Sequence, residues 1–142
     1  MFSKEESKKM RQEFWTEFGQ RHTRKWMLYN TSIKEIELKF TFDTEQAQVS
    51  LDVVSADDLI RAYYYEKLLG LKNILLTEYL PDALFEENYL LPEGKTVSRV
   101  YVQLKRVNIH SRKDWDLVQK FLNDRMNLME EFFKEYSDYI AD

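Results

Sequence analysis

The sequence predicts an α+β domain with a mainly antiparallel sheet of at least four strands, helices packed on one face, and the chain order αββαββα. Two observations support this class. Three serine–carboxylate signals typical of helix starts divide the chain, and stretches of alternating apolar and polar residues lie between them. The three signals are Ser3-Lys4-Glu5-Glu6, Ser55-Ala56-Asp57-Asp58 and Ser111-Arg112-Lys113-Asp114.

The first signal opens a helix expected from about Ser3 to Gln20. Met10, Phe14 and Phe18 recur four residues apart along it, which places them on one helical face. Residues 22–30 follow, and their pattern fits either a short strand or a packed connection. Residues 36–42 and 47–53 then alternate apolar and polar side chains around a turn at 43–46, as expected for a hairpin with one buried face.

The second signal opens a helix expected to start after Ser55 and to run to about Tyr79, because Pro81 prevents its continuation. Gly70 lies inside this helix and weakens it. A second hairpin is expected from residues 84–91 and 97–105, joined by a turn at 92–95. The third signal opens a helix from about Arg112 to Tyr139, whose apolar residues recur at spacings of three and four.

Length and composition limit the classes of protein to consider. The chain of 142 residues fits a single domain, 1–142, and its net charge of −4 argues against a generic nucleic-acid binder. The absence of cysteine excludes disulfides and thiolate chemistry. We expect no cofactor, because the three glycines are far apart and neither histidine stands near a cluster of acidic residues at metal-ligand spacing. With no signal peptide and no membrane span, we expect a cytoplasmic location.

The charge is unevenly distributed along the sequence. Residues 1–25 carry seven basic and four acidic side chains, and residues 99–113 carry five basic and no acidic ones. The remaining two stretches, 26–98 and 114–142, are both net acidic. The second basic stretch is the strongest functional candidate, because it precedes a helix start that favours an anion, and a tyrosine on its strand offers a stacking surface for a base. The candidate anion or nucleic-acid site comprises Arg99, Tyr101, Lys105, Arg106, His110, Arg112 and Lys113.

An alternative interpretation of this stretch and a second candidate site remain. Its charges are also explained as a solvated edge strand that pairs with the acidic remainder of the chain. Alternatively, Asp82 followed by Gln103 and Lys105 resembles the metal-dependent nuclease pattern, in which two acids hold Mg²⁺ and a lysine helps to place the attacking water. Here Gln103 replaces the second acid, and this loss weakens the nuclease interpretation.

Clustered aromatic residues give a third candidate. Tyr63, Tyr64 and Tyr65 span nearly a whole helical turn, so at least one ring is expected to point away from the main core. A second group covers more than one face late in the last helix, namely Phe132, Phe133, Tyr136 and Tyr139. These rings indicate either a wide core or a homodimer surface.

The opening residues 1–7, the pairs Phe14-Trp15 and Phe18-Gly19, the segment Arg24-Lys25-Trp26 and the late Ser111-Arg112-Lys113-Asp114-Trp115 resemble a bacterial family. This is an uncharacterised family of short proteins from Bacteroidetes-type bacteria, a domain of unknown function whose relatives are fused behind predicted nuclease domains. The resemblance covers nearly the whole chain. It implies a compact α+β domain associated with DNA-processing proteins, and it transfers no catalytic residue.

Taken together, these observations favour a non-enzymatic binding module that acts with DNA-processing or defence proteins. A small metal-dependent nuclease is the first alternative, and a structural homodimer without a ligand is the second. We expect no membrane partner.

Overall fold

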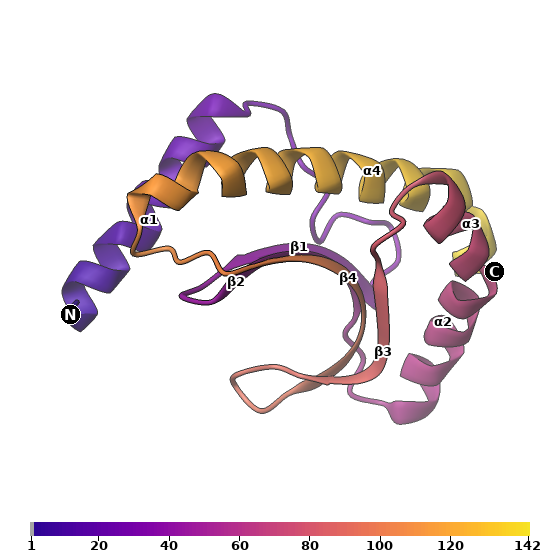
Figure 1. Ribbon diagram of the computed structural model, residues 1–142. Coiled ribbons are helices and arrows are strands. Elements are labelled where there is room, and N and C mark those ends of the chain that lie inside the picture. Colours follow the sequence, from indigo (N-terminus) through magenta and orange to yellow (C-terminus); the bar gives the residue numbers. More distant parts are fainter. Residues whose placement is uncertain (1) are drawn as a thin grey trace.

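The computed structural model describes residues 2–142, so Met1, which opens the segment that carries the resemblance, lies outside them. The helices and strands follow the predicted αββαββα order, with the second helix in two parts (Figure 1). Within residues 2–142, no helix combines the length and the apolar character needed to cross a membrane. The elements are α1 Lys4–Arg21, β1 Ile36–Phe42, β2 Gln46–Val53, α2 Asp58–Gly70, α3 Lys72–Glu78, β3 Leu84–Leu90, β4 Thr96–Lys105 and α4 Trp115–Ala141.

The four strands form one antiparallel sheet in the order β1-β2-β4-β3. Its centre joins the two predicted hairpins, because β2 pairs with β4. Leu51 lies opposite Val100 and Val49 opposite Val102, so the apolar sides of both strands share one face. β1 and β3 are therefore the edges of the sheet.

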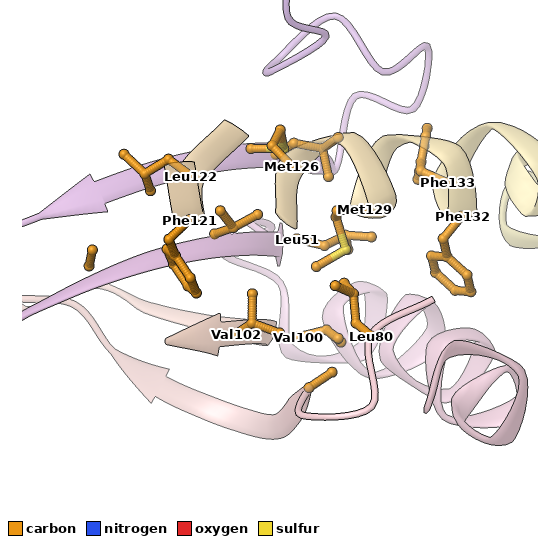
Figure 2. Close-up of a cluster of buried hydrophobic side chains, with 14 of the residues drawn as sticks. Leu51, Leu80, Val100, Val102, Phe121, Leu122, Met126, Met129, Phe132 and Phe133 are labelled. Atoms are coloured by element: carbon orange, nitrogen blue, oxygen red, sulfur yellow. The ribbon is translucent and has the colours of Figure 1, made fainter. Parts of the chain in front are cut away.

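The core lies between this apolar face and α4, which runs along the sheet (Figure 1). The alternation of β2 and β4 supplies one side of the core, and the three- and four-residue spacing of α4 supplies the other. Figure 2 shows Leu51, Val100 and Val102 pointing towards the side chains of α4. Those α4 side chains are buried, and Figure 2 labels Phe121, Leu122, Met126, Met129, Phe132 and Phe133.

α1 packs beside β1 through its aromatic stripe. The ring of Phe14 lies 4.8 Å from that of Phe42, and the ring of Phe18 lies 5.2 Å from that of Phe40. The connection from α1 to β1 contains no strand and is packed against the core, which settles the ambiguity of residues 22–30. Its Leu28 carbonyl accepts a hydrogen bond of 3.0 Å from the N–H of Leu38.

The other face of the sheet is polar yet buried at its centre, whereas the alternation predicts a single buried face. Gln48, Ser50 and Asp52 of β2 are buried there, as is Arg99 of β4. The register of β3 with β4 shifts between Glu86 and Tyr89, and such an irregularity bends a hairpin. The β3–β4 hairpin curls beneath the sheet, so the sheet is strongly curved (Figure 1).

The three predicted helix starts differ in the structure. At α1 the serine and the carboxylate form the expected capping box, in which each side chain bonds the other residue's backbone. Ser3 Oγ accepts from the Glu6 N–H and Glu6 Oε1 accepts from the Ser3 N–H, both at 3.1 Å. α2 is capped by Asp57, whose carboxylate accepts from the Leu59 N–H at 2.9 Å; Ser55 instead accepts from the N–H of Asp57. The prediction of Ser55 as the cap was therefore wrong.

At the third signal no capping box forms. A short 3₁₀ turn, Arg112–Asp114, precedes α4, and Ser111 makes no side-chain cap hydrogen bond. The carboxylate of Asp114 reaches back to the N–H of Asn108 at 2.9 Å. This contact holds the loop before the helix, so Asp114 does not accept from the Ser111 N–H as a capping box would require.

The second predicted helix is interrupted. α2 ends at Gly70 and α3 begins at Lys72, with Leu71 between them in a non-helical bridge conformation (φ −99°, ψ 3°). Apart from proline, glycine stabilises a helix less than any other residue does, so the break lies next to the weakest residue of the predicted helix. α3 then ends at Glu78, before Pro81.

Candidate nucleic-acid interface

Residues 105–113, which connect β4 to the last helix, form hydrogen bonds with the β1–β2 turn and with Trp115. Arg106 adopts a left-handed conformation (φ 63°), and its N–H donates to the Glu45 carbonyl at 3.0 Å. The Ile109 N–H donates to the Asp43 carbonyl at 3.0 Å. The Ile109 carbonyl accepts from the indole N–H of Trp115 at 2.8 Å. Because the apolar side chains in this segment are buried, the charged ones point outwards.

Five of the seven predicted site residues lie in this segment. Lys105, Arg106 and Lys113 are exposed, and none of them forms an ion pair within residues 2–142. The Arg112 guanidinium pairs with Glu13 and lies 4.6 Å from the centre of the Trp115 ring. The remaining residue, His110, is partly exposed.

The structure adds α1 to this end of the molecule. The rings of Phe2 and His110 lie 4.4 Å apart, and the Arg112–Glu13 pair joins the two segments further along α1. Figure 1 shows the connection between β4 and α4 running towards the end of the molecule where α1 begins. The two net-basic stretches of the sequence therefore meet. Four exposed basic side chains of α1 were not among the predicted site residues, namely Lys4, Lys8, Lys9 and Arg11.

Two open grooves border this basic end. One, of about 390 Å³, is lined by Lys105, Arg106 and the β1–β2 turn. The other, of about 520 Å³, lies between α1 and Arg112 and includes Lys9. Acidic residues also line them, Glu45 in the first groove and Glu13 and Glu17 in the second. Such a surface suits an extended polyanion, which several separate cations contact, better than a small anion that needs an enclosed site.

The start of α4 itself is already supplied with negative charge. Asp114 precedes the helix and Asp116 lies in its first turn, where Asp116 Oδ1 accepts from Arg21 Nη1 at 2.6 Å. Carboxylates at this position interact with the helix dipole as an anionic ligand would. The candidate interface therefore consists of side-chain cations and does not include the helix terminus.

Arg99 and Tyr101 lie away from this end, on the buried polar face. Arg99 is only 2% exposed, and its Nε and Nη2 donate to the two carboxylate oxygens of Asp52, each at 2.8 Å. Its Nη1 donates to Gln48 Oε1 at 2.9 Å. Burial disfavours the charged guanidinium, but the hydrogen bonds and charge of Asp52 outweigh this effect, so the pKa of Arg99 is raised. Arg99, predicted as part of the anion or nucleic-acid site, is therefore not accessible to such a ligand.

Tyr101 is similarly occupied within the protein. It is 5% exposed, its hydroxyl donates to Glu86, and its ring meets that of Tyr89 edge-on at 5.4 Å. Burial, followed by the hydrogen bond to the Glu86 carboxylate, raises the pKa of Tyr101. The ring is covered and is not available for a base to stack on it.

The sheet separates Asp82 from Gln103, two of the three residues of the nuclease alternative. Asp82 Oδ2 accepts from Arg125 Nη1 of α4 at 2.5 Å, which places Asp82 on the α4 side. Gln103 follows Val102 and lies on the opposite face, where it is paired with Gln48 in the register. Lys105 is exposed at the end of β4. In the part of the chain that the structure describes, no cluster of three or more acidic or histidine side chains is placed to hold a metal ion.

The aromatic clusters divide between the core and contacts within the chain. Tyr65 is buried and Tyr63 is exposed, as the sequence predicts for consecutive helical rings. Lys67 Nζ lies 5.3 Å from the centre of the Tyr63 ring and 5.0 Å from that of Tyr139. The Tyr63 hydroxyl donates to the carbonyl of Asp142. These contacts join α2 to the end of α4.

One comparison with known proteins gives a match. A family model described as "Domain of unknown function (DUF4268)" matches residues 10–137. No curated protein and no solved structure matches the chain at a significant level. The matched range begins within α1, at Met10, and includes residues 105–113 of the candidate interface. The description of the family assigns no chemistry to these residues.

Proposed function

The chain belongs to the DUF4268 family of domains of unknown function, and from its geometry we propose that it is a non-enzymatic module that binds the phosphate backbone of a nucleic acid through its basic end. The observation that supports this proposal is the meeting of the two net-basic stretches. Phe2 contacts His110 and Glu13 pairs with Arg112, so the cations of α1 lie beside those of residues 105–113.

The charge distribution makes this end distinct from the rest of the protein. The stretches 26–98 and 114–142 are net acidic, so a polyanion approaching the molecule is attracted to one end and repelled elsewhere. Lysine and arginine side chains that act as point charges recognise phosphates without reading the base sequence. We therefore propose binding that is independent of sequence and strongly dependent on salt.

A role beside DNA-processing or defence proteins extends this proposal. It rests on the resemblance to relatives fused behind predicted nuclease domains, and a backbone-binding module would hold DNA near such an enzyme. We do not propose a catalytic role for this chain, because Asp82 is paired with Arg125 on one side of the sheet while Gln103 lies on the other. A cytoplasmic location is part of the same proposal.

The test is binding of fluorescently labelled single- and double-stranded DNA of about 20 nucleotides, followed by anisotropy at several salt concentrations. The wild-type affinity should fall linearly on a log–log plot against salt. Lys105→Glu combined with Arg106→Glu should weaken binding by roughly 10- to 100-fold, because two phosphate contacts are lost and two repulsions replace them.

A matched variant controls for net charge. Lys95→Glu combined with Lys134→Glu makes the same change in total charge at two exposed lysines outside the basic end, and it should leave the affinity nearly unchanged. Equal losses in the two double variants would show that only net charge matters. Absence of DNA binding by the wild-type protein at low salt would reject the proposal.

A further inference from the structure

The outer edge of β1 carries backbone groups that point away from the sheet. The Leu38 N–H donates to the Leu28 carbonyl, and the Ile36 carbonyl accepts from Thr31 Oγ1 at 2.8 Å. The backbone N–H and C=O groups of the even-numbered residues of β1 therefore point away from β2, towards the open edge. Phe40 and Phe42 belong to the same set. Within residues 2–142, their N–H and C=O groups have no hydrogen-bond partner on that side. Such an open edge is a template for another strand.

An apolar groove of about 410 Å³ adjoins this edge. It is lined by Trp15, Leu28, Tyr29 and Phe40, together with Glu37, Leu38 and Lys39 of β1. Tyr29 is 74% exposed, and both Trp15 and Phe40 are only partly buried. A second chain that covered the groove would therefore remove this apolar surface from water, which is favourable.

We propose that a second copy of this chain pairs with the open edge, β1 against β1 in antiparallel orientation, about a two-fold axis at Thr41. This register sets Phe40 of each copy opposite Phe42 of the other. Each of these residues then donates and accepts one hydrogen bond across the axis, so the outward groups of both copies are satisfied reciprocally.

Charge complementarity supports the choice of a second copy and of this register. The pairing places Lys39 of each copy opposite Asp43 of the other, which gives two cross-strand pairs of opposite charge. Within residues 2–142 Lys39 forms no ion pair. Asp43 uses Oδ1 for the N–H groups of Glu45 and Gln46, which leaves Oδ2 for Lys39 of the other copy.

The neighbouring registers are less favourable. An axis at Phe40 would set Glu37 opposite Asp43 of the other copy, and like charges placed directly opposite destabilise a strand pair. It would also set Phe42 opposite Leu38, where Leu28 already occupies the edge. An axis at Phe42 would require pairing with Thr44, in the turn that leaves the strand. With the axis at Thr41, no like charges lie opposite each other over the paired residues 39–43, and the hydrogen-bonded pairs, Phe40 with Phe42 of the other copy, leave out both Leu38 and Thr44.

The dimer should be weak and dependent on concentration, because a short strand pair with one groove is smaller than the roughly 1,600 Å² interface of a stable complex. Sedimentation velocity of the full chain over a range of concentrations measures it. Lys39→Glu should raise the dissociation constant at least about tenfold, since it replaces two attractions with two repulsions. Lys95→Glu, an equal change of charge at an exposed turn, should leave the dissociation constant unchanged.

A cysteine variant locates the axis. The chain has no cysteine, so Thr41→Cys introduces a single thiol. Directly opposite residues of a non-hydrogen-bonded pair have Cα atoms about 4.5 Å apart, a distance that a disulfide spans. With oxidised glutathione, this variant should form a covalent dimer at least about tenfold faster than Thr77→Cys, whose thiol would lie on the exposed surface of α3.

Two results would overturn the proposal: a wild-type chain that stays monomeric at every concentration, or cross-linking of Thr41→Cys no faster than that of Thr77→Cys. The first result would leave the edge to a partner of another sequence, and the second would place self-association on another surface. Circular dichroism of each variant checks the fold. The inference does not depend on DNA binding, because the substituted residues, Lys39 and Thr41, lie outside the candidate interface.

Discussion

The ion pair between Arg99 and Asp52 is the most deeply buried charged contact in the structure. Both side chains are almost inaccessible to water, and Gln48 supplies a further acceptor to the guanidinium. In such a pair the mutual attraction is largely offset by the loss of hydration, so the intact pair adds little net stability. Removing one partner is different, because the other charge is then left buried and unpaired.

We therefore predict that Arg99→Met lowers the free energy of unfolding by about 3–5 kcal/mol, measured by urea denaturation. Adding Asp52→Leu to this variant should recover part of the loss, since no buried charge is then stranded. Arg61→Met is the matched control. Arg61 is also buried, but its partner Asp58 is exposed, so the loss there should be clearly smaller. Equal losses in the two single variants would contradict the buried-charge explanation.

At the scale of elements, the helix starts show how local sequence and local structure can differ. Ser55 has the residue type and spacing of a capping box, yet Asp57 caps α2 because the helix begins two residues later than that signal implies. Both side chains accept a backbone hydrogen bond, but only that of Asp57 satisfies free N–H groups of the helix itself.

This difference gives a prediction for α2. Asp57→Ala should lower the free energy of unfolding by about 1 kcal/mol, the usual effect of losing an N-cap. Ser55→Ala should have a smaller effect, because its contact lies outside the helix. Thermal or urea unfolding of the two variants, with Ser3→Ala as a capping-box reference, measures the order. A larger loss for Ser55→Ala would show that the serine is the effective cap.

The strands could be predicted from the sequence, whereas the burial of their polar side could not. Alternation assigns Arg99 and Tyr101 to one face of β4, and the register confirms that they share it. Alternation does not indicate what covers a face. The shifted pairing at Glu86 and Tyr89 curls the β3–β4 hairpin beneath the sheet, and this bend depends on contacts between strands that no local pattern encodes.

For the whole molecule, the charge tally identified two basic stretches but not their contact. Residues 1–25 and 99–113 are far apart in sequence, and they meet only because α1 packs beside β1 while β4 returns to the same end of the sheet. The residues predicted for the site came from the second stretch alone. The net positive charge of residues 1–25 could be read from the sequence, but the position of these residues depends on how the aromatic stripe of α1 packs.

If both stretches contribute to one surface, then α1 should contribute to nucleic-acid binding although residues 105–113 remain intact. We predict that Lys8→Gln combined with Lys9→Gln weakens DNA binding and reduces the magnitude of the slope of log affinity against log salt by about 1–2, since each lost phosphate contact removes about 0.7–0.9. These side chains are exposed and substitution to glutamine preserves helix propensity, so folding should be unaffected.

Adding these changes to Lys105→Glu and Arg106→Glu should reduce the magnitude of the slope further. An unchanged slope in the α1 variant would confine the interface to residues 105–113, and the meeting of the two basic stretches would then have no role in binding.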